Sequence, residues 1–141
     1  MHRVIGFLVC CAWLLCGACS PQPSSPSGAL DGTWAGTMTG DGSEAGGVTL
    51  VLAQTGAGVS GTFVMTRPSA PDRTGVVTGT LAAPVVLLTF ASPAPLVCSP
   101  TVTLSGTLSA TMTLNGSRMT GTYSAFTCGG AVGGTIDLTR G

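Results

Sequence analysis

The chain has 141 residues, a formal net charge of zero and a charged-residue content of only 7%, against about a quarter in a typical soluble domain. Such a balance provides no basic surface for nucleic acid, so it argues against that class of partner. Lysine is absent and the only histidine is His2, so we expect no catalytic role, no cofactor and no bound metal.

Residues 1–18 start with a short basic segment and continue with an apolar run too short to span a bilayer. Two small residues then precede Cys19, a pattern typical of an export signal that is cleaved before a cysteine. The segment resembles the lipobox of bacterial lipoproteins, although Cys16 stands where leucine is usual. The resemblance implies that Cys19 carries fatty acyl chains and anchors the protein in the cell envelope, with Ser20 favouring the outer membrane. Plain export, with cleavage after Ala18 and a free Cys19, is the alternative.

The next segment, residues 19–29, consists of the cysteine and a stretch rich in serine and proline. Residues 20–29 carry no charge and no large apolar side chain, so they cannot form a core, and we expect a flexible tether. The remaining residues, 30–141, are enough for a single domain with its own hydrophobic core.

Within this domain the apolar residues alternate with period two, and we find no segment with the 3.6-residue period of a helix. The clearest case is 101–114, where valine, leucine and methionine share one face and threonine and serine the other. The pattern predicts an all-β antiparallel up-and-down meander of about eight strands. The expected strands are 32–39, 47–54, 59–66, 74–82, 85–91, 101–114, 118–126 and 132–140.

Two hairpins can be given a register from their turn residues. An Asn-Gly turn after the sixth strand would place Met112 opposite Met119 and keep both apolar sets on one face. A turn at 55–56 would place Leu52 opposite Val59, and a four-residue loop there is the alternative.

Several glycines lie inside the expected strands and share the parity of the apolar residues. Glycine weakens a strand, so its repeated placement on one face indicates bent strands or close approach of neighbouring backbones. This favours a small closed or nearly closed barrel, with a two-sheet β-sandwich as the alternative. The glycines on this face are Gly36, Gly61, Gly79, Gly106, Gly121 and Gly134.

The first expected strand opens with Gly32, Thr33 and Trp34, which resembles the Gly-x-Trp motif of lipocalins and the wider calycin group. In that group an arginine late in the last strand packs across the tryptophan. The resemblance implies this role for Arg140, which has the parity of the apolar residues before it, with Arg118 as the second candidate.

Two cysteines remain in the domain, Cys98 and Cys128. Cys98 precedes the long strand 101–114 and Cys128 follows its hairpin partner, so the expected register brings both to the open end of one hairpin. Export places the chain in an oxidising compartment, so we expect a disulfide, with two buried free thiols as the alternative.

The inward-facing side chains suggest a function based on binding. We expect a lipid-anchored barrel that binds a small apolar ligand or a protein partner in its interior. The alternative is an envelope inhibitor or structural interaction protein whose barrel is filled. The interior residues expected to contact a ligand are Trp34, Met38, Phe63, Met65, Leu108, Met112, Met119 and Tyr123.

Overall fold

The computed structural model describes residues 28–40, 45–98, 101–113 and 115–141, which form eight β-strands and, within these ranges, no helix. No helix among them is therefore long and apolar enough to cross a membrane. The strands are β1 (Gly32–Gly40), β2 (Gly46–Thr55), β3 (Gly58–Arg67), β4 (Ala70–Ala82), β5 (Val85–Leu96), β6 (Val102–Met112), β7 (Arg118–Thr127) and β8 (Gly130–Arg140).

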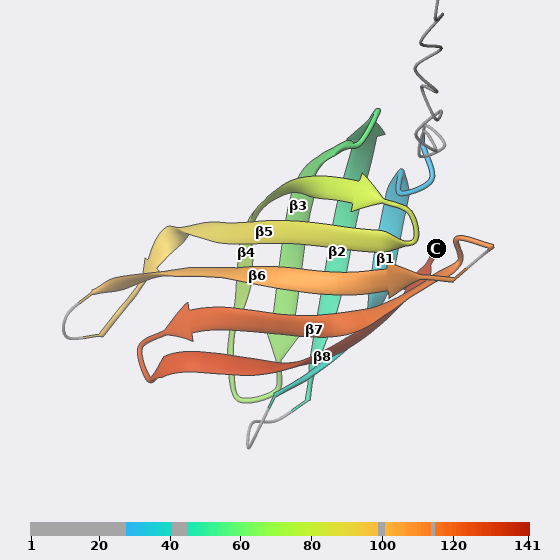
Figure 1. Cartoon of the computed structure of the whole chain (residues 1–141). Coiled ribbons are helices and arrows are strands. Elements are labelled where there is room, and N and C mark those ends of the chain that lie inside the picture. The colour runs from blue at the N-terminus through green and yellow to red at the C-terminus, as the bar shows by residue number, and fades with distance from the viewer. Residues whose placement is uncertain (1–27, 41–44, 99–100, 114) are drawn as a thin grey trace, which may run out of the picture.

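Each strand pairs antiparallel with the next, and β1 also pairs with β8, so the sheet closes into a barrel. In the closing pair Trp34 lies opposite Arg140 and Met38 opposite Ile136. In Figure 1, β1–β3 run behind β5–β8 and cross them, and β4 curves from one group to the other. The predicted all-β up-and-down barrel is confirmed. The β-sandwich alternative is excluded, because a sandwich would leave β1 and β8 unpaired with each other.

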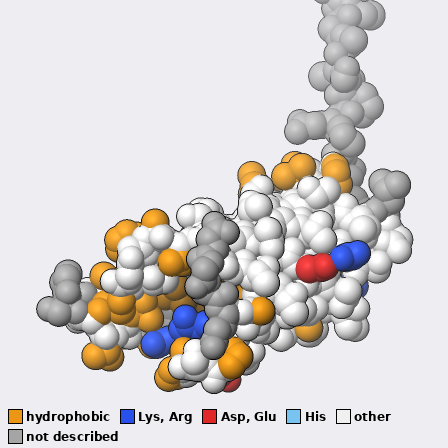
Figure 2. Space-filling view, turned by 90° about the horizontal axis from the view of Figure 1, so that it is seen from below, with side chains coloured by type: hydrophobic (Ala, Val, Ile, Leu, Met, Phe, Trp, Pro, Cys, Tyr) orange, Lys and Arg blue, Asp and Glu red, His pale blue; other side chains and the backbone are white. Residues whose placement is uncertain are grey.

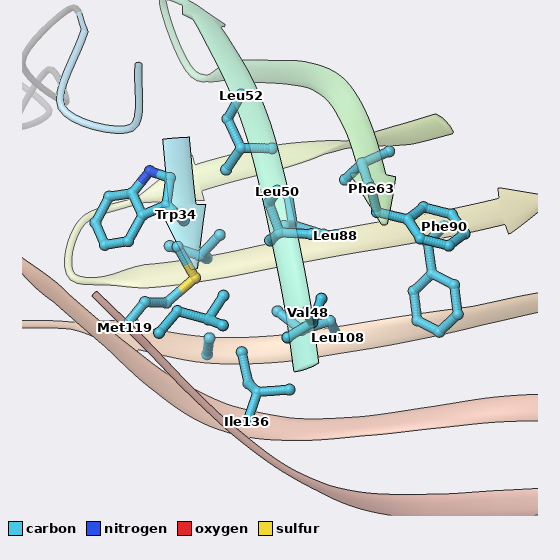
Figure 3. Close-up of a cluster of buried hydrophobic side chains, with 14 of the residues drawn as sticks. Trp34, Val48, Leu50, Leu52, Phe63, Leu88, Phe90, Leu108, Met119 and Ile136 are labelled. Carbon is cyan, nitrogen blue, oxygen red and sulfur yellow. The ribbon is translucent and has the colours of Figure 1, made fainter. Parts of the chain in front are cut away.

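The core is built from every second residue of the strands, which point into the barrel as the period-two alternation predicts. The threonines and serines of β6 lie on the outer face and are exposed, whereas its leucines are buried. Figure 3 shows side chains from strands on opposite sides of the barrel meeting in the interior. The labelled members of this cluster are Trp34, Val48, Leu50, Leu52, Phe63, Leu88, Phe90, Leu108, Met119 and Ile136.

The inward glycines allow neighbouring backbones to approach closely. At all six predicted positions an added Cβ would lie less than 3.0 Å from backbone atoms of the adjacent strand. At Gly121, for example, it would lie 2.5 Å from Ala110 Cα and 2.7 Å from Ala110 Cβ. Gly75 of β4 is in the same situation, which we did not predict. The shared parity therefore reflects the tight curvature of a small barrel.

The two predicted hairpin registers have different outcomes. Between β6 and β7, Met112 lies opposite Met119, as predicted. Between β2 and β3 the predicted pair of Leu52 with Val59 is wrong, because Val59 lies opposite Gln54. The turn residues are 56–57, and Gly56 has a φ of 60°, a left-handed conformation that glycine adopts without strain. The register differs by two residues, so the inward set keeps its parity.

Two strands exceed their predicted bounds by more than two residues: β4 already begins at Ala70, and β5 continues to Leu96. The added residues of β4 contain a register shift of the β3–β4 pair, between Arg73 and Ala70, and those of β5 contain one of the β5–β6 pair, between Ala91 and Pro95. A bulge interrupts the period-two alternation, so the sequence pattern ends there although the pairing continues. At the end of β6, residue 114 of the predicted strand lies outside the described residues.

Candidate functional site

One end of the barrel, where the odd-numbered strands begin, is closed by residues 28–31. They form a turn that places the fully buried Leu30 over the core. Leu30 N donates to Gln54 Oε1 at 3.0 Å, and Trp34 Nε1 donates to Leu30 O at 2.9 Å. These bonds satisfy the buried polar groups of the turn, so the closed end is held by both packing and hydrogen bonds.

Arg140 completes this end. Its Cζ lies 5.4 Å from the centroid of the Trp34 ring, within the range of a cation–π contact. Its guanidinium also donates to the carbonyl oxygen of Asp31 and to that of Gly28, each at 3.1 Å. The last strand is thereby tied to the turn that precedes the first.

Arg118, the other candidate for contact with the tryptophan, lies on the outer surface. It forms an exposed ion pair with Asp137, and its Nε donates to Asp137 Oδ1 at 2.8 Å. The hydrogen bond from Arg118 holds the pKa of the Asp137 carboxyl below its ordinary value. This pair joins β7 to β8 on the outside of the barrel.

The opposite end, where the odd-numbered strands terminate, contains a cavity of about 440 Å³. Figure 2 shows hydrophobic side chains gathered around a hollow at this end, with basic side chains beside it. Arg67 and Arg73 are the basic residues that line it. The larger apolar residues of its wall are Met38, Met65, Phe90, Leu96, Leu104 and Tyr123.

A second, apolar void of about 30 Å³ lies deeper in the barrel. It shares Met38, Met65, Phe90 and Tyr123 with the larger cavity, so these four side chains separate the two spaces. Its volume is close to the share of one water molecule in the liquid, too small for a ligand. The barrel is therefore filled in its closed half and hollow in its open half.

The predicted ligand-contacting residues are divided between these two halves. Met38, Met65 and Tyr123 line both spaces, whereas Phe63 and Leu108 line only the inner void. The other three, Trp34, Met112 and Met119, are buried and line neither space, so they are removed from the ligand-contacting set.

Sequence reasoning missed the two arginines of the cavity wall. Arg73 lies directly opposite Met65 in the β3–β4 pair and therefore on the inward face. The parity of β4 could have identified it, because Arg73 is two residues before Gly75 and four before the buried Val77. The predicted strand began only at residue 74, so Arg73 lay outside it.

A disulfide joins Cys98 and Cys128 at this open end. Their Cα atoms lie 5.7 Å apart, and the bond connects the β5–β6 connection to the β7–β8 turn. Cys128 also lines the cavity, so the bridge forms part of its wall. The described residues include no group of three or more histidine, cysteine or acidic side chains placed to hold a metal ion.

Fold and site together define a closed antiparallel β-barrel with one filled end and one hollow end. The sequence matches no protein-family model and no curated protein. The structure is similar to that of a redesigned β-barrel, mFAP1, bound to DFHBI, with a TM-score of 0.63 and 15% identity over 79% of this chain and 95% of that one. It is also similar to a second redesigned β-barrel, with a TM-score of 0.61 and 15% identity over 80% of this chain and 92% of that one. At this identity the likeness establishes the fold alone.

Proposed function

We propose that this protein is a lipid-anchored β-barrel of the bacterial cell envelope that binds a small apolar ligand at its open end and catalyses no reaction. The cavity of about 440 Å³ carries the proposal. Its volume lies within the range of about 300–1,000 Å³ that is usual for small-molecule sites, and its wall is mostly apolar. The barrel bound to DFHBI supports the proposal, because a barrel of similar fold there holds a small molecule.

The alternative, an interaction protein with a filled barrel, accounts for the closed half only. Met38, Met65 and Tyr123 pack against the core on one side, are only partly buried and border the cavity of the hollow half. Burial of such apolar surface by a ligand is favourable by about 25 cal/mol per Å². A ligand-binding role therefore accounts for more of the observed geometry.

The first test measures binding of the neutral fluorescent probe N-phenyl-1-naphthylamine to the exported chain carrying Cys19→Ala. Val132 lines the cavity and is 41% exposed, so Val132→Trp should narrow the mouth without overpacking the core. We expect this substitution to weaken probe binding by roughly tenfold or more. Val51→Trp is the matched control, because Val51 is 51% exposed on the outer face of β2. The proposal would be contradicted if the parent chain did not bind the probe, or if both variants lost the same amount of probe affinity.

The second test concerns the anchor at Cys19, which lies outside the described residues. Several acyl chains, each methylene worth about 0.8 kcal/mol, hold a domain of this size firmly to a membrane. We therefore expect Cys19→Ala to move the protein from the membrane fraction to a soluble pool in fractionated cells. Cys10→Ala is the control, since it alters a cysteine of the same signal and should leave the protein membrane-bound. A Cys19→Ala chain that still needs detergent for release would show that the lipobox interpretation is wrong.

The position of the closed end is compatible with a barrel that is anchored through its N-terminal tether and binds a ligand at the other end. Gly28, the first described residue, lies at the closed end and accepts a hydrogen bond from Arg140 there. The tether would therefore join the barrel at the closed end, and the cavity would open at the end remote from the anchor.

A further inference from the structure

We propose that the ligand of the open-end cavity is an anionic amphiphile, a single apolar chain ending in a carboxylate, whose head is bound by Arg73 and Arg67. This inference rests on the proposed ligand-binding function and specifies its ligand class. It is carried by two arginines in the wall of an otherwise mostly apolar cavity.

Arg73 is the stronger of the two observations. Its side chain is on the inward face of β4, opposite Met65, and is partly buried. Its Nε is buried and has no hydrogen-bond acceptor among the described residues. A buried guanidinium N–H without an acceptor is unfavourable, so this atom would be stabilised by an acceptor that enters the cavity.

Arg67 brings a second cation to the same space. A Cβ added at Gly46 would lie 3.2 Å from Arg67 Cγ and 3.5 Å from Met38 Cγ, so the aliphatic part of Arg67 lies beside the apolar wall. A guanidinium on such a stem can place its charge at the mouth while its methylenes extend the apolar lining.

The carboxylates of the described residues do not neutralise Arg67 and Arg73. Asp137 is paired with Arg118 on the outside of the barrel, and Asp31 lies at the closed end. Asp72 is exposed and does not line the cavity. Within the described ranges the cavity therefore contains two cationic side chains and no carboxylate. A carboxylate matches the fork of a guanidinium with two parallel hydrogen bonds, which a neutral head cannot provide.

The size of the space limits the rest of the ligand. A cavity of about 440 Å³ is near the lower end of the range of volumes usual for small-molecule sites. It therefore suits a ligand with one hydrocarbon chain rather than a lipid with several. The proposed carboxylate head and the proposed apolar chain of the ligand would contact different residues. The two arginines belong to β3 and β4, whereas Phe90, Leu96 and Leu104 come from β5 and β6. The cavity thus has a charged side and an apolar side, as an amphiphile requires.

The test compares three ligands with the same twelve-carbon chain: dodecanoate, dodecanol and dodecyltrimethylammonium. Each displaces the neutral probe from the exported Cys19→Ala chain, at concentrations below micelle formation. We expect dodecanoate to bind roughly tenfold more tightly than dodecanol, and the ammonium to bind most weakly. Arg73→Met, which keeps an apolar stem, should remove the preference for dodecanoate over dodecanol.

Arg118→Met is the matched control, because it removes the same charge from the outer surface. It should retain the preference for dodecanoate. Equal affinities for the three ligands in the parent chain would overturn the inference on the head group while leaving an apolar site in place. A preference that survives Arg73→Met would also overturn it. If neither the probe nor any of the three ligands binds, the proposed function itself fails.

Discussion

Gly121→Val and Gly106→Val will each lower the free energy of unfolding by about 3 kcal/mol or more, because an inward side chain has no space there. An added Cβ at Gly106 would lie 2.5 Å from Phe90 Cζ and 2.9 Å from Ala125 Cα. The aromatic ring could shift, but Ala125 Cα is part of the adjacent backbone. Relief of the overlap would therefore separate β6 from β7 and disrupt their hydrogen bonds. Denaturant unfolding of the exported Cys19→Ala chain measures the loss.

The matched controls place the same valine on the opposite face, one residue along the chain. Thr107 and Thr122 point outward and are exposed, so Thr107→Val and Thr122→Val should change stability by no more than about half a kcal/mol. Comparable losses at both parities would show that the inward assignment of the glycines does not govern stability.

Removal of the disulfide, with Cys98→Ala and Cys128→Ala combined, will cost about 3 to 4 kcal/mol of stability in the chain-entropy model. The cysteines are separated by 30 residues, so the reduced unfolded chain gains the freedom of a long loop. Thermal or denaturant unfolding of the doubly substituted chain, compared with its parent, gives the value.

A chemical control tests the pairing itself. In a cleaved chain that carries Cys19→Ala, Cys98 and Cys128 are the only remaining cysteines. Alkylation of the unfolded protein without reductant should therefore label no residue, and alkylation after reduction should label both. Labelling before reduction would contradict the bridge.

How far the sequence predicts the structure differs between the wall of the barrel and its contents. Strand alternation depends on the local geometry of an extended backbone, which places neighbouring side chains on opposite faces whatever the fold. The order of strands followed from their short connections, which leave antiparallel neighbours as the simplest arrangement. The register of β2 with β3 was less accessible, because glycine permits the turn at either of two neighbouring positions.

The two register shifts set a second limit on what the sequence predicts about the site. Leu96 lies beyond the register shift of the β5–β6 pair, where the period-two pattern no longer identifies the inward face, and Arg73 is the last β4 residue before the shift of the β3–β4 pair, one residue outside the predicted strand. Both residues contribute to the cavity. The cavity wall, with its charged residue Arg73, was therefore the part of the structure that the sequence pattern predicted least well.

The all-β class, the inward face of most strand residues and the crowding at the inward glycines could be predicted from the amino-acid sequence, since these follow from side-chain parity and from the absence of a Cβ. Which inward residues contact one another depends on how the strands close into the barrel. Trp34 and Met38 have the same parity on β1, yet Trp34 is packed under Leu30 and Arg140 whereas Met38 faces the cavity. Parity specifies a face but carries no information on distance along the barrel axis. That distance depends on closure of β1 against β8 and on the turn at 28–31, both of which join residues far apart in the chain.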